Sequence, residues 1–232
     1  MKASISKNVV DFFQLFFPDY CLHCQNHIGL ERLPLCLNCR LELPLTDFSR
    51  WSRNRLEKNF SGRIKLEAAT GLFYYSRKGI VQKLINELKY KGNQSIGAYL
   101  GLWLGEKMRN SKRFDKIDLI IPVPLHALKE KKRGYNQVHT FAQGLSEELD
   151  VLCDTRLLLK RSDNSSQTTK SRIERDRNHN LFYLSEPEKA VGKHILLVDD
   201  VITSGATMIA CVRAFEKISS VRFSLACIAF TP

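Results

Sequence analysis

The stretch "HILLVDDVITSGATM", residues 194–208, decides the fold of this chain. An apolar run with strand character ends in two adjacent carboxylates, Asp199 and Asp200, and a short hydroxyl- and glycine-containing segment then leads into a helical pattern. In an open parallel sheet, ligands bind outside the carboxyl ends of the strands. The sequence therefore predicts a ligand site at the end of this strand.

The two halves of this stretch suit different parts of one ligand. The paired carboxylates can accept hydrogen bonds from a diol. The following turn enters a helix whose first N–H groups lack partners and favour an anion, and its glycine allows a close backbone approach. A ribose 5-phosphate satisfies both halves. The residues of this turn are Thr203, Ser204, Gly205, Ala206 and Thr207.

Two other interpretations of this stretch were weighed. An isolated acid pair can be a solvated strand end followed by an ordinary serine N-cap. A bacterial receiver domain also has adjacent acids after an apolar strand, but it needs a longer α/β run after them than the single helix and strand that remain here. The full pattern favours the sugar phosphate.

Composition restricts the partners and the compartment. The chain has 232 residues and a formal net charge of +12, which favours phosphorylated metabolites, nucleic acid or an anionic membrane surface. Its seven cysteines are an odd number and unevenly placed, which argues against a secreted disulfide framework and for the cytoplasm. We expect no transmembrane segment: residues 9–18 form the nearest apolar run, and Asp11 and Gln14 interrupt it. We interpret that run as an amphipathic helix packing on the protein, with membrane-surface contact as the alternative.

Four cysteines lie within residues 21–39 as two CxxC pairs, and they predict a structural Zn²⁺ site. A tetrahedral zinc site takes four thiolates, and so small a module cannot fold on an apolar core alone. A redox CxxC would need only one pair, and four thiolates leave no free position for catalysis. His23 and His27 could substitute as ligands. The predicted ligands are Cys21, Cys24, Cys36 and Cys39.

Apolar strand patterns alternate with helical ones from Ala68 onward, which indicates an α/β domain with a mainly parallel sheet and helices on both faces. Lys89 and Lys91 end one helix, and we interpret them as its solvated last turn, favoured by the dipole; contact with an anion is the alternative. The predicted strands are 68–76, 116–125, 181–184, 194–198 and 222–230, and the predicted helices are 77–90, 95–109, 137–149 and 205–217.

At this point the chain resembles a known family. "LLVDDVITSGAT" is similar to the phosphoribosyl pyrophosphate (PRPP) signature of type I phosphoribosyltransferases. "IPVPLHALKEKKRGYNQ" and "SQTTKSRIERDRN" narrow the resemblance to the ComF/GntX family of competence-associated, phosphoribosyltransferase-like proteins. It covers nearly the whole chain. It implies a small zinc-binding module before a type I phosphoribosyltransferase-like domain. Together with the residue pattern this predicts an N-terminal helix and zinc-binding module at 1–47, a basic linker or exposed basic face at 48–66, and the phosphoribosyltransferase-like domain at 67–232.

The resemblance also implies roles for individual residues. Asp199 and Asp200 would hold the ribose hydroxyls, and the turn 203–207 the 5-phosphate. A hood at 161–178, with Gln167, would close over the ligand and exclude water. Its arginines and Mg²⁺ would stabilise the leaving pyrophosphate, although a solvated basic loop or a nucleic-acid contact would use the same residue type. The catalytic assignments are Asp199, Asp200, Arg172 and Arg175, and the loop meeting pyrophosphate and Mg²⁺ contains Arg133, Gly134, Asn136 and Gln137.

Three functional hypotheses follow from the resemblance. The first is PRPP-dependent phosphoribosyl transfer to an unidentified acceptor, with a part in natural competence and DNA uptake alongside machinery at the inner membrane. The second is a non-enzymatic adaptor for single-stranded DNA that uses PRPP as a regulatory ligand. Its DNA contact would be the basic segment 50–65, with Trp51 and Phe60 as stacking faces. The third is a nucleotide-salvage transferase, although Thr203 stands where purine salvage relatives often carry an acid.

Overall fold

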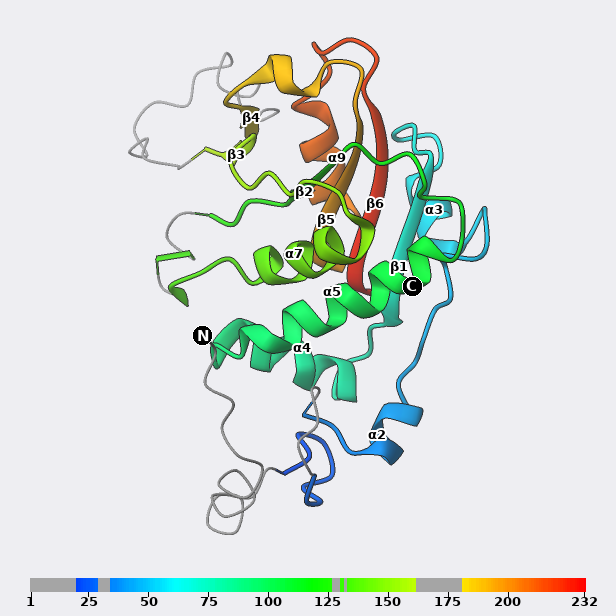
Figure 1. The fold of residues 1–232 in the computed structure, drawn as a ribbon, viewed down its shortest axis with the longest axis vertical. Helices are drawn as coiled ribbons and strands as arrows, with labels where there is room; N and C mark the ends of the chain where they lie inside the picture. Colours follow the sequence, from blue (N-terminus) through cyan, green and yellow to red (C-terminus); the bar gives the residue numbers. More distant parts are fainter. Residues whose placement is uncertain (1–19, 29–33, 127–129, 132, 162–180) are drawn as a thin grey trace, which may run out of the picture.

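The computed structural model describes residues 20–28, 34–126, 130–131, 133–161 and 181–232. At its centre is a sheet of four parallel strands in the order β1-β6-β5-β2 (Figure 1). The two middle strands are long and almost entirely buried, as expected for a parallel sheet covered on both sides. The strands are β1 Ala68–Tyr74, β2 Leu119–Pro122, β5 His194–Ile202 and β6 Arg222–Phe230.

Helices cover both faces of this sheet, which confirms the predicted fold class. α4 (Ile80–Tyr90), α5 (Gln94–Arg109) and α7 (Gln137–Leu149) contribute their apolar sides to one half of the core. α9 (Ala206–Arg213) and α3 (Arg55–Phe60) contribute to the other half. β5 and β6 place residues in both halves, so the ends of these strands lie between the two sets of helices.

Helices α5 and α7 pack backbone against backbone. A Cβ added at Gly101 would lie 2.3 Å from the carbonyl oxygen of Phe141, and one added at Gly144 would lie 2.3 Å from that of Ala98. No side chain fits at either position unless the helices separate. This contact fixes the position of α7, and therefore also the position of Gln137, the first residue of that helix.

The segment 48–66 is not a linker over its whole length. It contains α3, whose Leu56 and Phe60 are fully buried, and Phe48 is buried with them. Asn54 caps the helix by accepting from the N–H of Glu57 at 3.0 Å, and its amide donates to three backbone carbonyls. The sequence pattern did not predict this helix, because its six residues are too few for an apolar periodicity to stand out among the basic residues around them.

Further differences concern lengths and a short sheet. β5 continues past the expected end at 198 to Ile202, because Val201 and Ile202 still pair with β6. α9 ends at Arg213 rather than 217. An unexpected strand, β3 (Leu158–Lys160), pairs antiparallel with β4 (Phe182–Leu184), and these two strands flank the segment 162–180, which lies outside the described residues.

The cysteine module is continuous with the main core. Cys21, Leu35 and Cys39 are buried in the same cluster as the apolar faces of α4 and α5, and the short helix α2 (Leu37–Leu41) belongs to this module. Lys83 of α4 donates to the carbonyl of His23 at 3.3 Å. No helix in the described part of the chain has both the length and the apolar character that a bilayer span requires.

Candidate functional site

The two acids lie within β5, close to its carboxyl end, rather than after it. Successive side chains of a strand point to opposite faces of a sheet, so the pleat separates the two carboxylates. Asp200 contacts residues of α4 and α7 on one face. Asp199 pairs in register with Cys227 and lies among groups of the α9 face. The acids therefore face different surroundings.

Asp200 is buried and well satisfied. Its Oδ2 accepts from Nε2 of Gln137 at 2.7 Å and pairs with Nζ of Lys89 at 2.8 Å. Its Oδ1 accepts from the N–H of Val201 at 2.6 Å. Two helices and the next residue of β5 thus supply donors to one carboxylate, as a buried charge requires.

Asp199 has fewer partners. Part of the residue reaches the surface, but its carboxyl is enclosed by protein atoms. Burial, and then the neighbouring charge of Asp200, raise its pKa to about 8, although the backbone N–H of Asp200 and the ammonium groups of Lys89 and Lys160 oppose the rise. In the ligand-free protein Asp199 is therefore mostly protonated at neutral pH.

The turn after β5 has the shape expected of an anion site. Gly205 is the N-cap of α9 and adopts φ 74°, in the left-handed region that favours glycine. A cavity of about 40 Å³, large enough for a small polar group, is lined by Asp199 and by residues 201–208. The first N–H groups of α9 have no acceptors within the helix and lie at this cavity.

Helix α3 supports this turn from outside. Asn59 donates to the carbonyl of Thr203 at 3.0 Å, and Arg63 donates to that of Ser204 at 2.7 Å. The ring of Phe60 lies so close that a Cβ on Gly205 would be 2.5 Å from it. Phe60 is therefore a support beneath the turn, and the expectation that it offers a stacking face to DNA is wrong.

The loop before α7 brings together some of the residues expected there. Arg133 donates to Oε1 of Gln137 at 2.8 Å, and its guanidinium lies 5.2 Å from the ring centre of Tyr90. Gly134 adopts φ 79°. Asn136 is buried, caps α7 by accepting from Val138 and donates to the carbonyl of Val123, so its side chain positions the helix. Gln167, Arg172 and Arg175 lie outside the described residues.

Sequence reasoning assigned Lys89 to a solvated turn, and the structure corrects this. Its side chain is only 21% exposed and pairs with Asp200, whereas Lys91 is 70% exposed and pairs with Glu87. A signal for its burial, though not for its partner, was available, because Lys89 follows the buried Ile85 by one turn of α4. Lys160 was also missed, since it ends a strand of only three residues.

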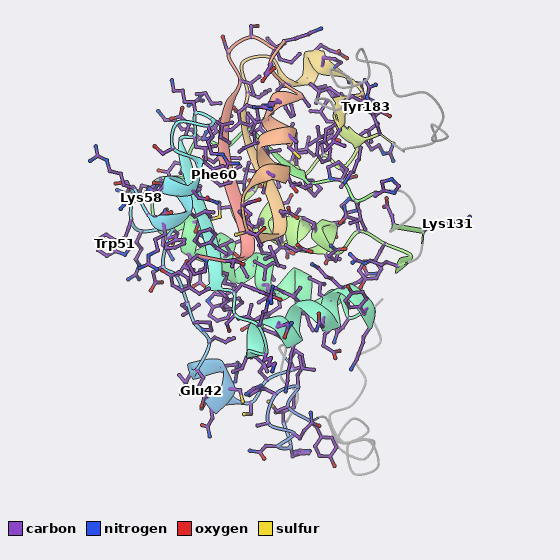
Figure 2. The ribbon with its side chains drawn as sticks, turned by 180° about the vertical axis from the view of Figure 1, so that it is seen from behind. Glu42, Trp51, Lys58, Phe60, Lys131 and Tyr183 are labelled. Carbon is purple, nitrogen blue, oxygen red and sulfur yellow. The ribbon has the colours of Figure 1, made fainter. Side chains whose placement is uncertain are left out.

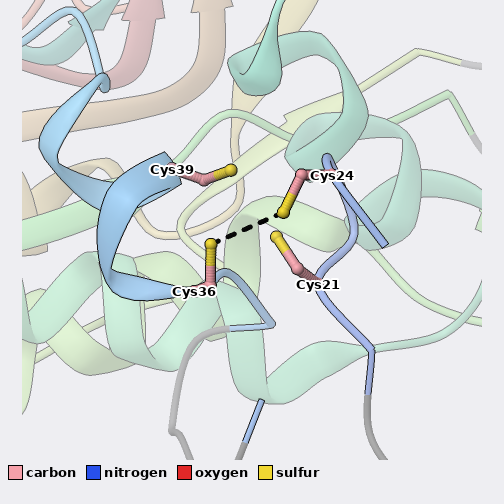
Figure 3. Close-up of side chains that lie close together, drawn as sticks. All are labelled: Cys21, Cys24, Cys36 and Cys39. Carbon is pink, nitrogen blue, oxygen red and sulfur yellow. Dashed lines mark hydrogen bonds between the residues drawn. The ribbon is translucent and has the colours of Figure 1, made fainter. Parts of the chain in front are cut away.

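The four cysteines meet as predicted (Figure 3). All four sulfur atoms lie within 4.8 Å of one another, and those of Cys24 and Cys36 are 3.5 Å apart. A tetrahedral site with Zn–S bonds of about 2.3 Å needs sulfurs about 3.8 Å apart. Burial raises the pKa of Cys21, but backbone hydrogen bonds lower it to about 6 overall, whereas burial and the neighbouring thiols raise the pKa of Cys39. The donor set therefore fits Zn²⁺. Among the described residues this metal-ligand cluster contains neither His23 nor His27.

Comparison with known proteins identifies relatives. A family model described as the phosphoribosyl transferase domain matches residues 137–232. Competence protein F of Haemophilus influenzae is 26% identical over 213 residues, 88% of this chain and 93% of that protein. DNA utilization protein YhgH of Escherichia coli O157:H7 is 30% identical over 54% of this chain. Competence protein ComFC of Bacillus subtilis is 27% identical over 58% of it.

The extent of these matches differs. The chain spans about half the length of the last two relatives, 56% of YhgH and 52% of ComFC. A crystal structure of adenine phosphoribosyltransferase aligns with 64% of this chain and 74% of its own at 16% identity, with a TM-score of 0.38. The relative matched over nearly its entire length and the domain match over residues 137–232 both support the resemblance of this chain to the phosphoribosyltransferase-like proteins of the ComF family.

Proposed function

We propose that this protein binds PRPP at the carboxyl end of β5 and transfers its phosphoribosyl group to an acceptor. The observation that carries the proposal is the direct succession of two strand-end acids and a glycine-shaped turn at a helix N-terminus. The turn 203–207 would take the 5-phosphate, and the carboxylates would take the ribose hydroxyls.

The charges around the site support a pyrophosphate leaving group. Lys89 and Arg133 lie near Asp200 on one face, and Lys160 acts on Asp199 from the other. Mg²⁺, held by carboxylate and phosphate oxygens, would stabilise the charge that develops as pyrophosphate leaves. Because Asp200 Oδ2 already has two partners, the ligand itself would supply most of the oxygens around such an ion. The catalytic roles of Arg172 and Arg175 belong to the same proposal.

The biological setting is proposed from the relatives. Three of them are named for competence or for DNA utilization. We therefore place the proposed activity in the handling of incoming DNA, in the cytoplasm near the uptake machinery at the inner membrane. The salvage hypothesis has no acid at Thr203 to support it.

A second candidate is the single-stranded DNA adaptor. An open groove of about 630 Å³ beside the phosphate turn is lined by Arg55, Lys58 and Asn59 of α3, by Thr203 and Ser204, and by the last residues of the chain. Trp51 is 65% exposed and offers a stacking face. Figure 2 shows Trp51 and Lys58 on the same side of the molecule. Basic groups with an exposed ring suit a single strand.

The PRPP proposal is tested by ligand stabilisation. PRPP with Mg²⁺ at 100 times its Kd should raise the unfolding free energy by about 2.7 kcal/mol. Asp199→Asn with Asp200→Asn should remove this gain, because each amide keeps only one neutral acceptor oxygen and no charge for the diol and Mg²⁺. Asp115→Asn, at an exposed acid near the opposite, amino end of β5, should keep it. Thermal shift and calorimetry measure both effects, and unchanged binding in the double variant would refute the site.

The raised pKa of Asp199 predicts a dependence of stability on pH. Between about pH 4 and 8 the folded protein keeps a proton that the unfolded chain has released. The unfolding free energy should therefore decrease as pH rises through this window. In Asp199→Asn this part of the slope should disappear, and the variant should be more stable than the wild type at pH 8. Urea titrations at several pH values test this; equal slopes in both proteins would contradict it.

We also propose that the four thiolates hold one structural Zn²⁺ per chain. Elemental analysis of protein purified without chelators should find one zinc, and Cys36→Ser should lose it and destabilise the protein by at least about 2 kcal/mol. Cys153→Ser, outside the cluster, should keep the metal. PRPP binding should survive in the folded fraction of Cys36→Ser. Absence of zinc from the wild-type protein would contradict the assignment of the four cysteines as a zinc site.

The hypothesis of a single-stranded DNA adaptor leads to a separate prediction. Arg55→Ala with Lys58→Ala should weaken single-stranded DNA binding and reduce the slope of log K against log salt by about 1.4, for two lost phosphate contacts. Lys193→Ala with Lys217→Ala removes equal charge at other exposed positions and should leave the slope unchanged. Fluorescence anisotropy at several salt concentrations measures this. If both double substitutions change the salt slope equally, α3 contains no specific DNA site.

A further inference from the structure

Lys89 occupies the junction of the acid pair and the loop before α7. Its ammonium lies 2.8 Å from Oδ2 of Asp200, the same oxygen that accepts from Gln137. The next residue, Tyr90, stacks with Arg133, and Arg133 donates to Gln137. The hydroxyl of Tyr135 donates to the carbonyl of Leu88. The end of α4 is therefore tied to this loop by contacts on both sides of Lys89.

The two partners of Asp200 Oδ2 differ in their freedom to move. Gln137 is buried, and both ends of its amide are engaged, by Asp200 and by Arg133. Lys89 is 21% exposed, and a lysine carries its charge on a flexible four-carbon chain. Of these two donors, the lysine is the one that can release Asp200 without disturbing a helix start.

A phosphoribosyl ligand would favour this release. A carboxylate offers about four acceptor positions. In the structure three of those on Asp200 are filled, by Gln137, Lys89 and the N–H of Val201. A diol brings two further donors to the acid pair, and the pyrophosphate of the same ligand brings negative charge that needs a cation nearby.

We propose that Lys89 exchanges partners when the ligand binds. It neutralises Asp200 in the free protein, and it contacts the pyrophosphate oxygens once a ribose hydroxyl has taken its place on the carboxylate. This inference rests on the proposed function and adds to it a specific contact: Lys89 recognises the pyrophosphate end of the ligand, not the sugar. The competing explanation is a fixed ion pair that only keeps Asp200 charged.

Two ligands separate these explanations. Ribose 5-phosphate has the diol and the 5-phosphate but lacks pyrophosphate. Replacing Lys89 by Met should therefore weaken PRPP binding about 10–100-fold, the value of a charge-assisted hydrogen bond, and change ribose 5-phosphate binding less than about threefold. Lys91→Met, two residues further along, should leave both affinities unchanged, because Lys91 pairs with Glu87 instead. Titration calorimetry with each ligand measures the affinities.

Each outcome has a defined meaning. If Lys89→Met loses affinity for PRPP and for ribose 5-phosphate equally, Lys89 acts only through Asp200. If its PRPP affinity is unchanged, Lys89 makes no contact with the pyrophosphate. Either result overturns the proposal. If Lys89→Met does not fold, Lys89→Gln keeps a donor for Asp200 and should show the same selective loss. If the wild-type protein binds neither ligand, the proposed function itself fails, which is distinct from a loss confined to the variants.

Discussion

The buried carboxylate of Asp200 is the constraint on which the arrangement around β5 depends. An isolated charge at this position would be strongly destabilising, so the fold brings an amide from α7, an ammonium from α4 and a backbone N–H to it. The two side-chain partners come from helices that pack on the same face of the sheet, and the N–H belongs to β5 itself. The backbone contact of α5 with α7 holds the amide in place. The neighbouring Asp199, without such partners, keeps a proton instead.

The turn 203–207 depends on the other face in a similar way. Its carbonyls at Thr203 and Ser204 accept from Asn59 of α3 and from Arg63, which follows α3, and these contacts hold the turn in place. The left-handed glycine at the start of α9 needs space that only a residue without Cβ leaves beside Phe60. At the carboxyl end of β5, α4 and α7 thus provide an ammonium group and an amide donor. On the other face, α3 and α9 shape the turn that we propose as an anion site. Neither half is complete without helices that are distant in sequence.

Much of the fold and of the candidate site could be predicted from local sequence patterns. The acid pair, the glycine turn, the two CxxC pairs and the alternation of strands and helices are contiguous in sequence, and they predicted the parallel sheet and the thiolate cluster. The contact of Lys89 with Asp200 joins residues 111 positions apart, and no local pattern encodes it. α3 and β3 were too short for their periodicity to stand out from basic surroundings. The separation of Asp199 from Asp200 was deducible from the pleat of a strand, since the acids are neighbours.

The position of Phe60 also bears on how such a protein can diversify. Its ring belongs to the segment before β1, yet it determines the shape of a turn more than 140 residues later. Recombination that exchanged N-terminal modules at a boundary just before Ala68 would separate the ring from its glycine and remove the two donors beside it. The part of the chain that must be inherited together therefore begins no later than Phe48, where the buried residues of the segment 48–66 start.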